Sequence, residues 1–187
     1  FKQKTAYEIK DCDWSSDVCS SDLDPSFARD GFYGGPAGDY PDNGERFTLL
    51  GRAALEAIRA EARPVDVLHG HDWQAGPAIL SLDARYRSDP LLAGTPSVLT
   101  CHNLAYHGWV PRERAWALDL PAHIGAPDGV DLLREAVRTT ELVNTVSPTY
   151  ARESLTPEYG AGLDDVLAAG FFNEKWAFPL PNGGAKK

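Results

Sequence analysis

The stretch Val65-Asp66-Val67-Leu68-His69-Gly70-His71-Asp72-Trp73 decides the fold class of this chain. Residues 65–69 form a short apolar run, which is typical of a strand that is buried in a parallel sheet. Polar side chains follow directly, over residues 69–73. The sequence therefore predicts a buried strand that ends in a group of chemically active side chains.

An amphipathic helix is predicted upstream of this strand, over residues 45–62. Asn43 is placed to cap its first turn, and Pro64 is placed to end it. Residues 31–44 are rich in Gly, Pro, Asp and Tyr and are predicted to form a loop. We expect one helix face to be buried, because its apolar side chains keep a 3.6-residue period; they are Phe47, Leu50, Ala54, Leu55 and Ile58.

Strand and helix patterns alternate along the rest of the chain. Helices are predicted over residues 74–86, over residues 132–140 and from Pro148 onward, and strands over residues 97–102 and 142–146. Such alternation indicates a parallel sheet with right-handed crossovers. The predicted fold class is therefore α/β, with a Rossmann-like parallel sheet.

A second polar cluster follows the strand predicted over residues 97–102. In open α/β sheets ligands bind at the carboxyl ends of the strands. If the two strands are neighbours, Asp72, His102 and Asn103 face one crevice. A carboxylate, an imidazole and a carboxamide suit the hydroxyl groups of a sugar, and Asp72 can favour positive charge that develops at an anomeric carbon. The alternative is that these side chains only bond nearby backbone groups.

A metal site is the competing interpretation of the first cluster, because His69 and His71 have the spacing of a familiar ligand pair. The hydrolase motifs that resemble it continue with Asp-His, whereas Trp73 and Gln74 follow here. We also expect His69 and His71 to point to opposite faces of the strand. The prediction is therefore that no metal is bound and that both histidines belong to the scaffold. Cys101, inside a predicted strand, is expected to be a small core residue rather than a nucleophile.

Composition narrows the classes of partner and the compartment. The net charge is −9, which argues against a nucleic-acid partner but not against a neutral glucan. No apolar run approaches the roughly 18–20 residues of a membrane span, so no membrane association is expected. The three cysteines, Cys12, Cys19 and Cys101, are odd in number and irregularly spaced. They do not form a disulfide framework, and a reducing cytoplasm is the expected location.

The two ends of the chain differ in pattern from the residues between them. Residues 1–23 show no helical or strand period, and we interpret them as a non-native leader that resembles translated adaptor sequence. Residues 171–187 are rich in aromatic side chains, predict no clear element, and are interpreted as an off-pattern tail. The expected domain therefore spans residues 24–170.

Four motifs appear in order along the chain. They are Asp-Tyr-Pro-Asp-Asn-Gly-Glu-Arg-Phe at residues 39–47, Val-Asp-Val-Leu-His-Gly-His-Asp-Trp-Gln-Ala-Gly at 65–76, Thr-Cys-His-Asn-Leu-Ala-Tyr-His-Gly at 100–108 and Asn-Thr-Val-Ser-Pro-Thr-Tyr-Ala-Arg-Glu at 144–153. Together they resemble the bacterial glycogen and starch synthases that use ADP-glucose, and the resemblance covers residues 24–169. It implies the GT-B architecture, in which the active site lies between two Rossmann-like domains. It also implies transfer of glucose from ADP-glucose to the non-reducing end of an α-1,4-glucan, with retention of configuration and without a cofactor.

The resemblance implies roles for individual residues. Asp72 would lie at the sugar cleft and be important for activity, and His102 would bond a hydroxyl of the transferred glucose. Asn103 would sit beside that glucose, and Tyr33 would be a further sugar contact. Two aromatic residues, Trp73 and Tyr106, would be wall and packing residues of the substrate site.

The sequence also departs from the family pattern. The family begins with a strand and a Lys-x-Gly-Gly-Leu loop that reaches the donor phosphates, and it continues into a C-terminal domain that supplies most of the nucleotide pocket. Neither pattern is found here. Because retaining transfer needs the donor phosphates held against the leaving charge, we expect this chain alone to be inactive and to need that C-terminal domain. Two alternatives stay open, a non-catalytic glucan-binding module and a metal-dependent hydrolase built on residues 69–72.

Overall fold

The computed structural model describes residues 25–172, with the side chains of residues 25–169. The leader predicted over residues 1–23 lies outside the described residues, as does most of the predicted tail. The chain divides into two compact units, Phe1–Pro41 and Asp42–Lys187.

A short antiparallel hairpin occupies the described part of the first unit. Its strands are β1 (Gly34–Gly35) and β2 (Gly38–Asp39). The N–H of Tyr40 donates to the carbonyl of Tyr33 at 2.8 Å, and the guanidinium of Arg29 lies 4.7 Å over the Tyr40 ring. The sequence predicted only a loop here, because strands of two residues are too short to show an alternating pattern.

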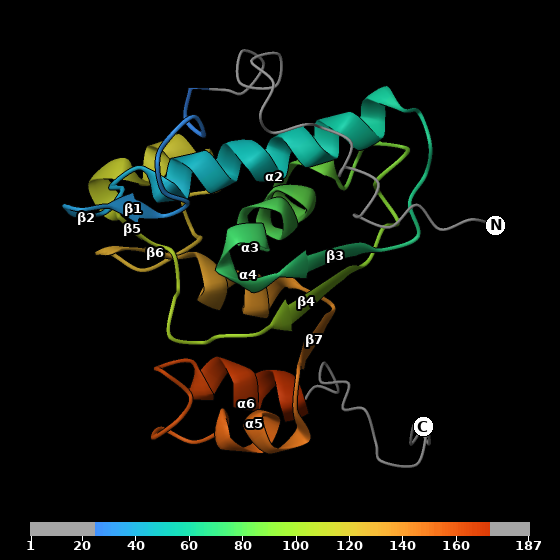
Figure 1. The fold of residues 1–187 in the computed structure, drawn as a ribbon. Coiled ribbons are helices and arrows are strands. Elements are labelled where there is room, and N and C mark those ends of the chain that lie inside the picture. The colour runs from blue at the N-terminus through green and yellow to red at the C-terminus, as the bar shows by residue number, and fades with distance from the viewer. Residues whose placement is uncertain (1–24, 173–187) are drawn as a thin grey trace. The chain divides into compact units, whose positions relative to one another are not determined.

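The second unit is built on a parallel three-stranded sheet in the order β3-β4-β7 (Figure 1). The register pairs His71 with Thr100 and Cys101 with Thr145, so all three strands end at the same edge. The predicted α/β class with a Rossmann-like parallel sheet is confirmed. The strands are β3 (Leu68–His71), β4 (Ser97–Cys101) and β7 (Leu142–Thr145).

The first strand of this sheet starts later than predicted. It begins at Leu68 rather than at residue 65, and Val67 is 48% exposed. The apolar run that suggested a fully buried strand is therefore partly a surface connection.

Helix α2 (Asn43–Ala60) buries only part of the predicted face: Phe47 and Leu55 are buried and Ile58 is half-buried, as expected. Leu50 is 49% exposed and Ala54 is exposed, whereas Gly44, Thr48 and Gly51 are buried. A Cβ added at Gly51 would lie 2.7 Å from the backbone nitrogen of Ala78, so small residues let α2 approach helix α3 (Asp72–Ser81) closely. A hydrophobic period does not detect positions that are buried because their side chains are small.

The start of α2 also differs from the prediction. Asn43 is the first helical residue rather than the cap, and its side chain accepts a hydrogen bond from the guanidinium of Arg46. The helix ends at Ala60, and the chain reverses at Ala62, whose φ is 51°. Pro64 therefore lies beyond the end of the helix.

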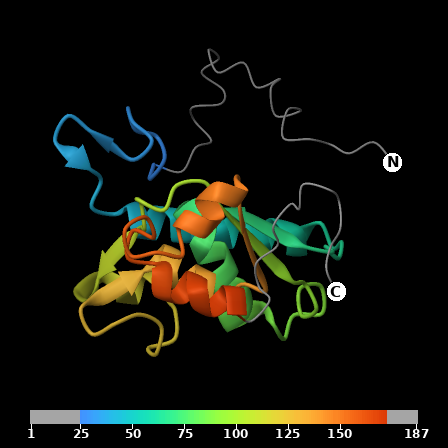
Figure 2. The ribbon, with the colours of Figure 1, turned by 90° about the horizontal axis from the view of Figure 1, so that it is seen from below.

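The helices predicted over residues 74–86, over residues 132–140 and from Pro148 are all present. The helix predicted over residues 74–86 is α3 (Asp72–Ser81) continued by a π-helical turn, η2 (Leu82–Tyr86). The predicted helix at Pro148 is capped by Ser147, whose hydroxyl accepts from two backbone N–H groups. The later helices are α4 (Leu132–Thr139), α5 (Pro148–Glu153) and α6 (Asp164–Phe172). Helix α6 was not predicted, and its end at Phe172 falls in the segment for which no clear element was expected. In Figure 1, α5 and α6 lie below β7, and in Figure 2, which views the structure from below, they lie at the front.

An antiparallel strand pair between β4 and α4 was not predicted. Its strands are β5 (Trp109–Pro111) and β6 (Gly129–Asp131), joined by a segment that contains the 3₁₀ helix η3 (Arg112–Leu118). The main core packs α3, α4 and the parallel sheet around fully buried leucines such as Leu80, Leu99 and Leu133. Among residues 25–172, no helix combines the length and apolar character that crossing a bilayer requires.

Candidate active site at the ends of the parallel strands

Asp72 links the ends of β3 and β4, which carry the two polar clusters predicted from the sequence. It is the first residue of α3, directly after β3, and its φ of 56° lies in the left-handed region that few residues besides Gly and Asn adopt as readily as Asp. Its Oδ1 accepts hydrogen bonds from the backbone N–H groups of His102, at 2.6 Å, and Asn103, at 3.2 Å. The structure thus brings Asp72, His102 and Asn103 together at one edge of the sheet.

Histidine side chains cover one face of the end of β3. Gly70 is buried against α3, where an added Cβ would lie 2.9 Å from the Cβ of Ala75. Its neighbours His69 and His71 therefore project from the other face, and their ring centroids lie 4.4 Å apart. The expectation that these two histidines point to opposite faces is wrong, because residues i and i+2 of a strand share a face.

The protonation of His69 follows from its hydrogen bonds. The hydroxyl of Thr100 donates to the side-chain oxygen of Asn144, so its only proton is used. The Nε2 of His69, 2.7 Å from the same hydroxyl oxygen, must therefore be the donor in that contact. Burial, followed by the nearby rings of His71 and His102, lowers the pKa of His69, which favours this neutral form.

His71 and His102 form a direct side-chain pair across β3 and the loop after β4. The Nδ1 of His71 lies 3.0 Å from the Nε2 of His102, and the ring centroids are 5.3 Å apart. Both side chains are exposed. Within the described part of the chain, the second ring nitrogen of each has no hydrogen-bond partner, so His102 can offer its Nδ1 to a ligand.

The loop after β4, residues 102–108, is held in place by residues that the sequence did not single out for this purpose. The buried N–H of Leu104 donates to the hydroxyl of Tyr150 at 3.1 Å. The Nδ1 of His107 lies 2.6 Å from a carboxylate oxygen of Asp131, and its Nε2 lies 2.8 Å from the carbonyl of Leu104. The hydrogen bond to Asp131 raises the pKa of His107. His107 and Tyr150 lie in the motifs at residues 100–108 and 144–153. Nothing in the sequence indicates that His107 bonds Asp131 or that Tyr150 bonds Leu104.

The aromatic residues expected to line the substrate site have different surroundings. Trp73 is only 7% exposed, packs edge to face on Phe47 with centroids 4.9 Å apart, and leaves no room for a Cβ at Gly108. Trp73 is therefore a core residue that positions the loop. Tyr106 is 62% exposed on that loop, and Tyr33 belongs to the other compact unit.

The described residues contain no group of three or more side chains that is suited to hold a metal ion. His69 and His71 share a face, but His69 is engaged with Thr100 and His71 with His102. Cys101 is buried, and burial raises the pKa of its thiol to about 12. The prediction that Cys101 is a core residue is confirmed.

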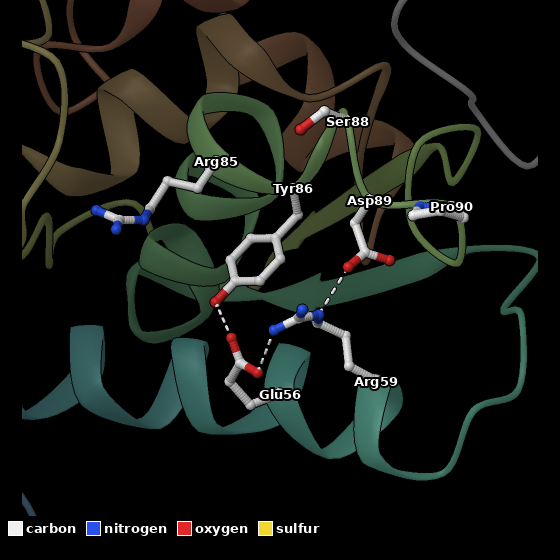
Figure 3. A pocket seen from close by; sticks show the side chains of 7 residues that line it. All are labelled: Glu56, Arg59, Arg85, Tyr86, Ser88, Asp89 and Pro90. Carbon is white, nitrogen blue, oxygen red and sulfur yellow. Dashed lines mark hydrogen bonds and ion pairs between the residues drawn. The ribbon is translucent and has the colours of Figure 1, made fainter.

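A separate polar pocket lies between α2 and the turn after η2, with a volume of about 420 Å³ (Figure 3). Its groups bond one another: Glu56 accepts from Tyr86 at 2.6 Å, and Arg59 contacts both Glu56 and Asp89. These contacts fasten the end of α2 to the chain that follows η2. The pocket shares no residue with the cluster around Asp72.

Comparison with known proteins shows which family the chain is similar to. A family model described as the starch synthase catalytic domain matches residues 5–169. Glycogen synthase 2 of Geobacter sulfurreducens is 43% identical over 151 residues, which cover 76% of this chain and 31% of that protein. A glycogen synthase of Rhizobium leguminosarum bv. trifolii is 45% identical over 149 residues, which cover 74% of this chain and 30% of that protein.

A solved structure shows the same fold. It is the catalytic domain of starch synthase IV from Arabidopsis thaliana bound to ADP and acarbose, with a TM-score of 0.71 and 30% sequence identity. The match covers 81% of this chain and 31% of that one. The chain therefore spans roughly a third of the length of the proteins it matches.

Proposed function

The chain belongs to the starch synthase catalytic domain family, and from this premise we propose that it is part of a glycogen or starch synthase with the GT-B architecture. The proposed reaction transfers glucose from ADP-glucose to the non-reducing end of an α-1,4-glucan, with retention of configuration. The observation that carries the proposal is the contact of the Asp72 carboxylate with the backbone of His102 and Asn103. It holds two polar side chains at the strand ends, where α/β sheets bind their ligands.

In this proposal His102 and Asn103 bind the transferred glucose. Both are exposed at the edge of the sheet, and one ring nitrogen of His102 has no partner among residues 25–169, so it is available to a hydroxyl. Asp72 has one carboxylate oxygen engaged with the loop, and its negative charge favours a positively charged anomeric carbon. Tyr106 and Tyr33 are exposed enough to contact a sugar, whereas Trp73 acts from the core.

The donor phosphates require groups outside this cluster. Within the described residues, the partners of Asp72, His102 and Asn103 are backbone N–H groups and one imidazole, with no Lys or Arg among them. The negative charge that develops on a leaving ADP needs cationic or N–H donors. We propose that these come from the part of the relatives that this chain does not span. The solved catalytic domain of starch synthase IV is bound to ADP and acarbose. This supports nucleotide and glucan ligands for the protein of which this chain is proposed to be a part.

A chimera tests this function directly. The region of Geobacter sulfurreducens glycogen synthase 2 that matches this chain is replaced by the chain's own residues, and incorporation of labelled glucose from ADP-glucose into glycogen is measured. We expect clear incorporation, with a loss of about 100-fold or more in the His102→Ala chimera. A folded chimera without any incorporation, beside an active parent enzyme, would contradict the proposal.

Experiments on the chain by itself distinguish between the alternative functions. We expect the chain to show no glucose incorporation, because in this proposal the donor phosphates are held by groups outside it. Binding to glycogen in a pull-down, lost in Asp72→Ala, would favour a glucan-binding module, and stoichiometric zinc in elemental analysis would favour a metal hydrolase. We also propose a cytoplasmic location, which the free, buried thiol of Cys101 supports.

A further inference from the structure

We propose that His71 is a positioning residue for His102, which it holds in one ring orientation and one tautomer through the bond between His71 Nδ1 and His102 Nε2. This role rests on the proposed function, in which His102 contacts the glucose. The sequence treated His71 as part of the scaffold. The structure instead gives its side chain a polar partner in the cluster, 3.0 Å away.

The chemistry of two neutral imidazoles explains the effect. Each carries one N–H and one unprotonated nitrogen, so a hydrogen bond between them needs the proton on exactly one of the two facing nitrogens. Donation by His102 Nε2 to His71 Nδ1 places the proton of both rings on Nε2, which is the more stable tautomer of a neutral histidine. The Nδ1 of His102, which points away from His71, is then an acceptor for a sugar hydroxyl. An exposed histidine without such a partner exchanges between its two tautomers.

The surroundings of His71 favour a fixed ring. It sits on β3, whose register pairs it with Thr100, so its backbone does not depend on the loop. The ring of His69 lies against it with centroids 4.4 Å apart and is itself bonded to Thr100. On the other side, Asp72 fixes the backbone of His102. His102 is thus held at its backbone by Asp72 and at its ring by His71.

The test is nitrogen NMR of the histidine side chains in the ¹⁵N-histidine-labelled chain, washed with EDTA so that no metal bridges the two rings. The spectra are recorded at about pH 8, above the ordinary histidine pKa of about 6.5. We expect the two ring nitrogens of His102 to give well-separated resonances, one protonated and one unprotonated. We also expect a scalar coupling between His71 Nδ1 and His102 Nε2 across the hydrogen bond.

Two substitutions at His71 separate positioning from folding. In His71→Leu the two His102 resonances should move toward each other, because both tautomers become populated. His71→Asn places an amide close to the position of the lost Nδ1 and should restore the separation. His123→Gln is the matched control, since His123 is an exposed histidine outside the cluster at the strand ends, and it should leave the His102 resonances unchanged.

The proposal is overturned if His102 keeps its separated resonances in a folded His71→Leu chain, or if the unchanged chain shows no coupling between the two nitrogens. The coupling decides the question even if His71→Leu does not fold. These readouts need no enzymatic activity. A failed proposal for His71 would therefore leave the chimera result standing, and an inactive chimera would leave the histidine pair standing.

Discussion

The Oδ1 atom of Asp72 lies 2.6 Å from the backbone nitrogen of His102, so the carboxylate forms part of the hydrogen bonding of a loop that is distant in sequence. Asp72 thereby acquires two separable functions. It supplies negative charge at the cluster, and it fixes the backbone that carries His102 and Asn103. The left-handed backbone at Asp72 is what turns its side chain toward that loop.

Replacement of Asp72 by Asn and by Ala separates these functions. Asn tolerates the left-handed backbone and keeps an oxygen acceptor, so we expect Asp72→Asn to lose less than about 1 kcal/mol of unfolding free energy. Ala loses both contacts and is strained at positive φ, and we expect a loss of about 2 kcal/mol. Urea unfolding of the two variants measures this difference.

The same pair in the chimera reports on catalysis. If the charge of Asp72 acts at the anomeric carbon, glucose transfer falls strongly in both variants. If Asp72 only holds the loop, Asp72→Asn keeps most of the activity and Asp72→Ala does not. Equal stability of the two variants would show that the contact to the loop contributes nothing measurable.

Gly108 determines how closely the loop packs on Trp73. Its φ is 68°, and an added Cβ would overlap the indole ring. Left-handed backbone costs a non-glycine residue about 1 kcal/mol, and overpacking adds about 1–3 kcal/mol. We therefore expect Gly108→Ala to lower the unfolding free energy by about 2–4 kcal/mol in urea unfolding.

Gly162 supplies the matched control for this substitution. Its φ is 81°, but nothing lies within 4 Å of an added Cβ. Gly162→Ala should therefore lose only the conformational contribution, about 1 kcal/mol. If both variants lose the same amount, the Trp73 ring moves aside at no cost and does not fix the loop.

The sequence predicted the parts of the site that depend on strand order. Apolar runs located β4 and β7, and a parallel sheet necessarily brings the residues after His71 and Cys101 to one edge. What it did not predict depends on individual side-chain contacts. The bond between His71 and His102 links positions 31 residues apart, and the bond between Leu104 and Tyr150 links positions 46 residues apart. No periodic pattern encodes such pairs.

The part of the α2 face that was missed has a similar physical cause. The prediction followed apolar residues and so included Leu50 and Ala54, which are exposed, but it left out Gly44, Thr48 and Gly51, which are buried. Close approach of two helices selects for small side chains rather than for apolar ones, which a hydrophobic period does not report.

His107 should make the stability of the chain depend on pH. Its two ring nitrogens face a carboxylate oxygen of Asp131 and the carbonyl of Leu104, and only an imidazolium donates to both. The hydrogen bond to Asp131 raises the pKa of His107 in the folded state. The stabilisation is therefore fully present below the unfolded pKa of about 6.5 and is lost as the pH rises through the raised folded pKa.

Urea unfolding of the parent and of His107→Gln across this pH range measures the effect. Since Gln does not titrate, the difference in unfolding free energy between the two chains should shrink as the pH rises above about 6.5. Titrating groups that do not contact His107 are common to both chains and cancel in the difference. A difference that stays constant over the range would mean that His107 does not gain its proton more readily on folding.

Tyr150 should protect the backbone of the loop through a single hydrogen bond. Its hydroxyl accepts from the N–H of Leu104, a residue that is only 2% exposed, so Tyr150→Phe leaves a buried donor without its partner. Such a loss costs about 1–3 kcal/mol. We expect a lower unfolding free energy and faster hydrogen exchange at the Leu104 amide.

Tyr159→Phe is the control, because the Tyr159 side chain is 53% exposed and its hydroxyl has no hydrogen-bond partner among residues 25–169. It should change neither the unfolding free energy nor the exchange at Leu104. Unchanged exchange at Leu104 in Tyr150→Phe would show that another group, or water, replaces the hydroxyl.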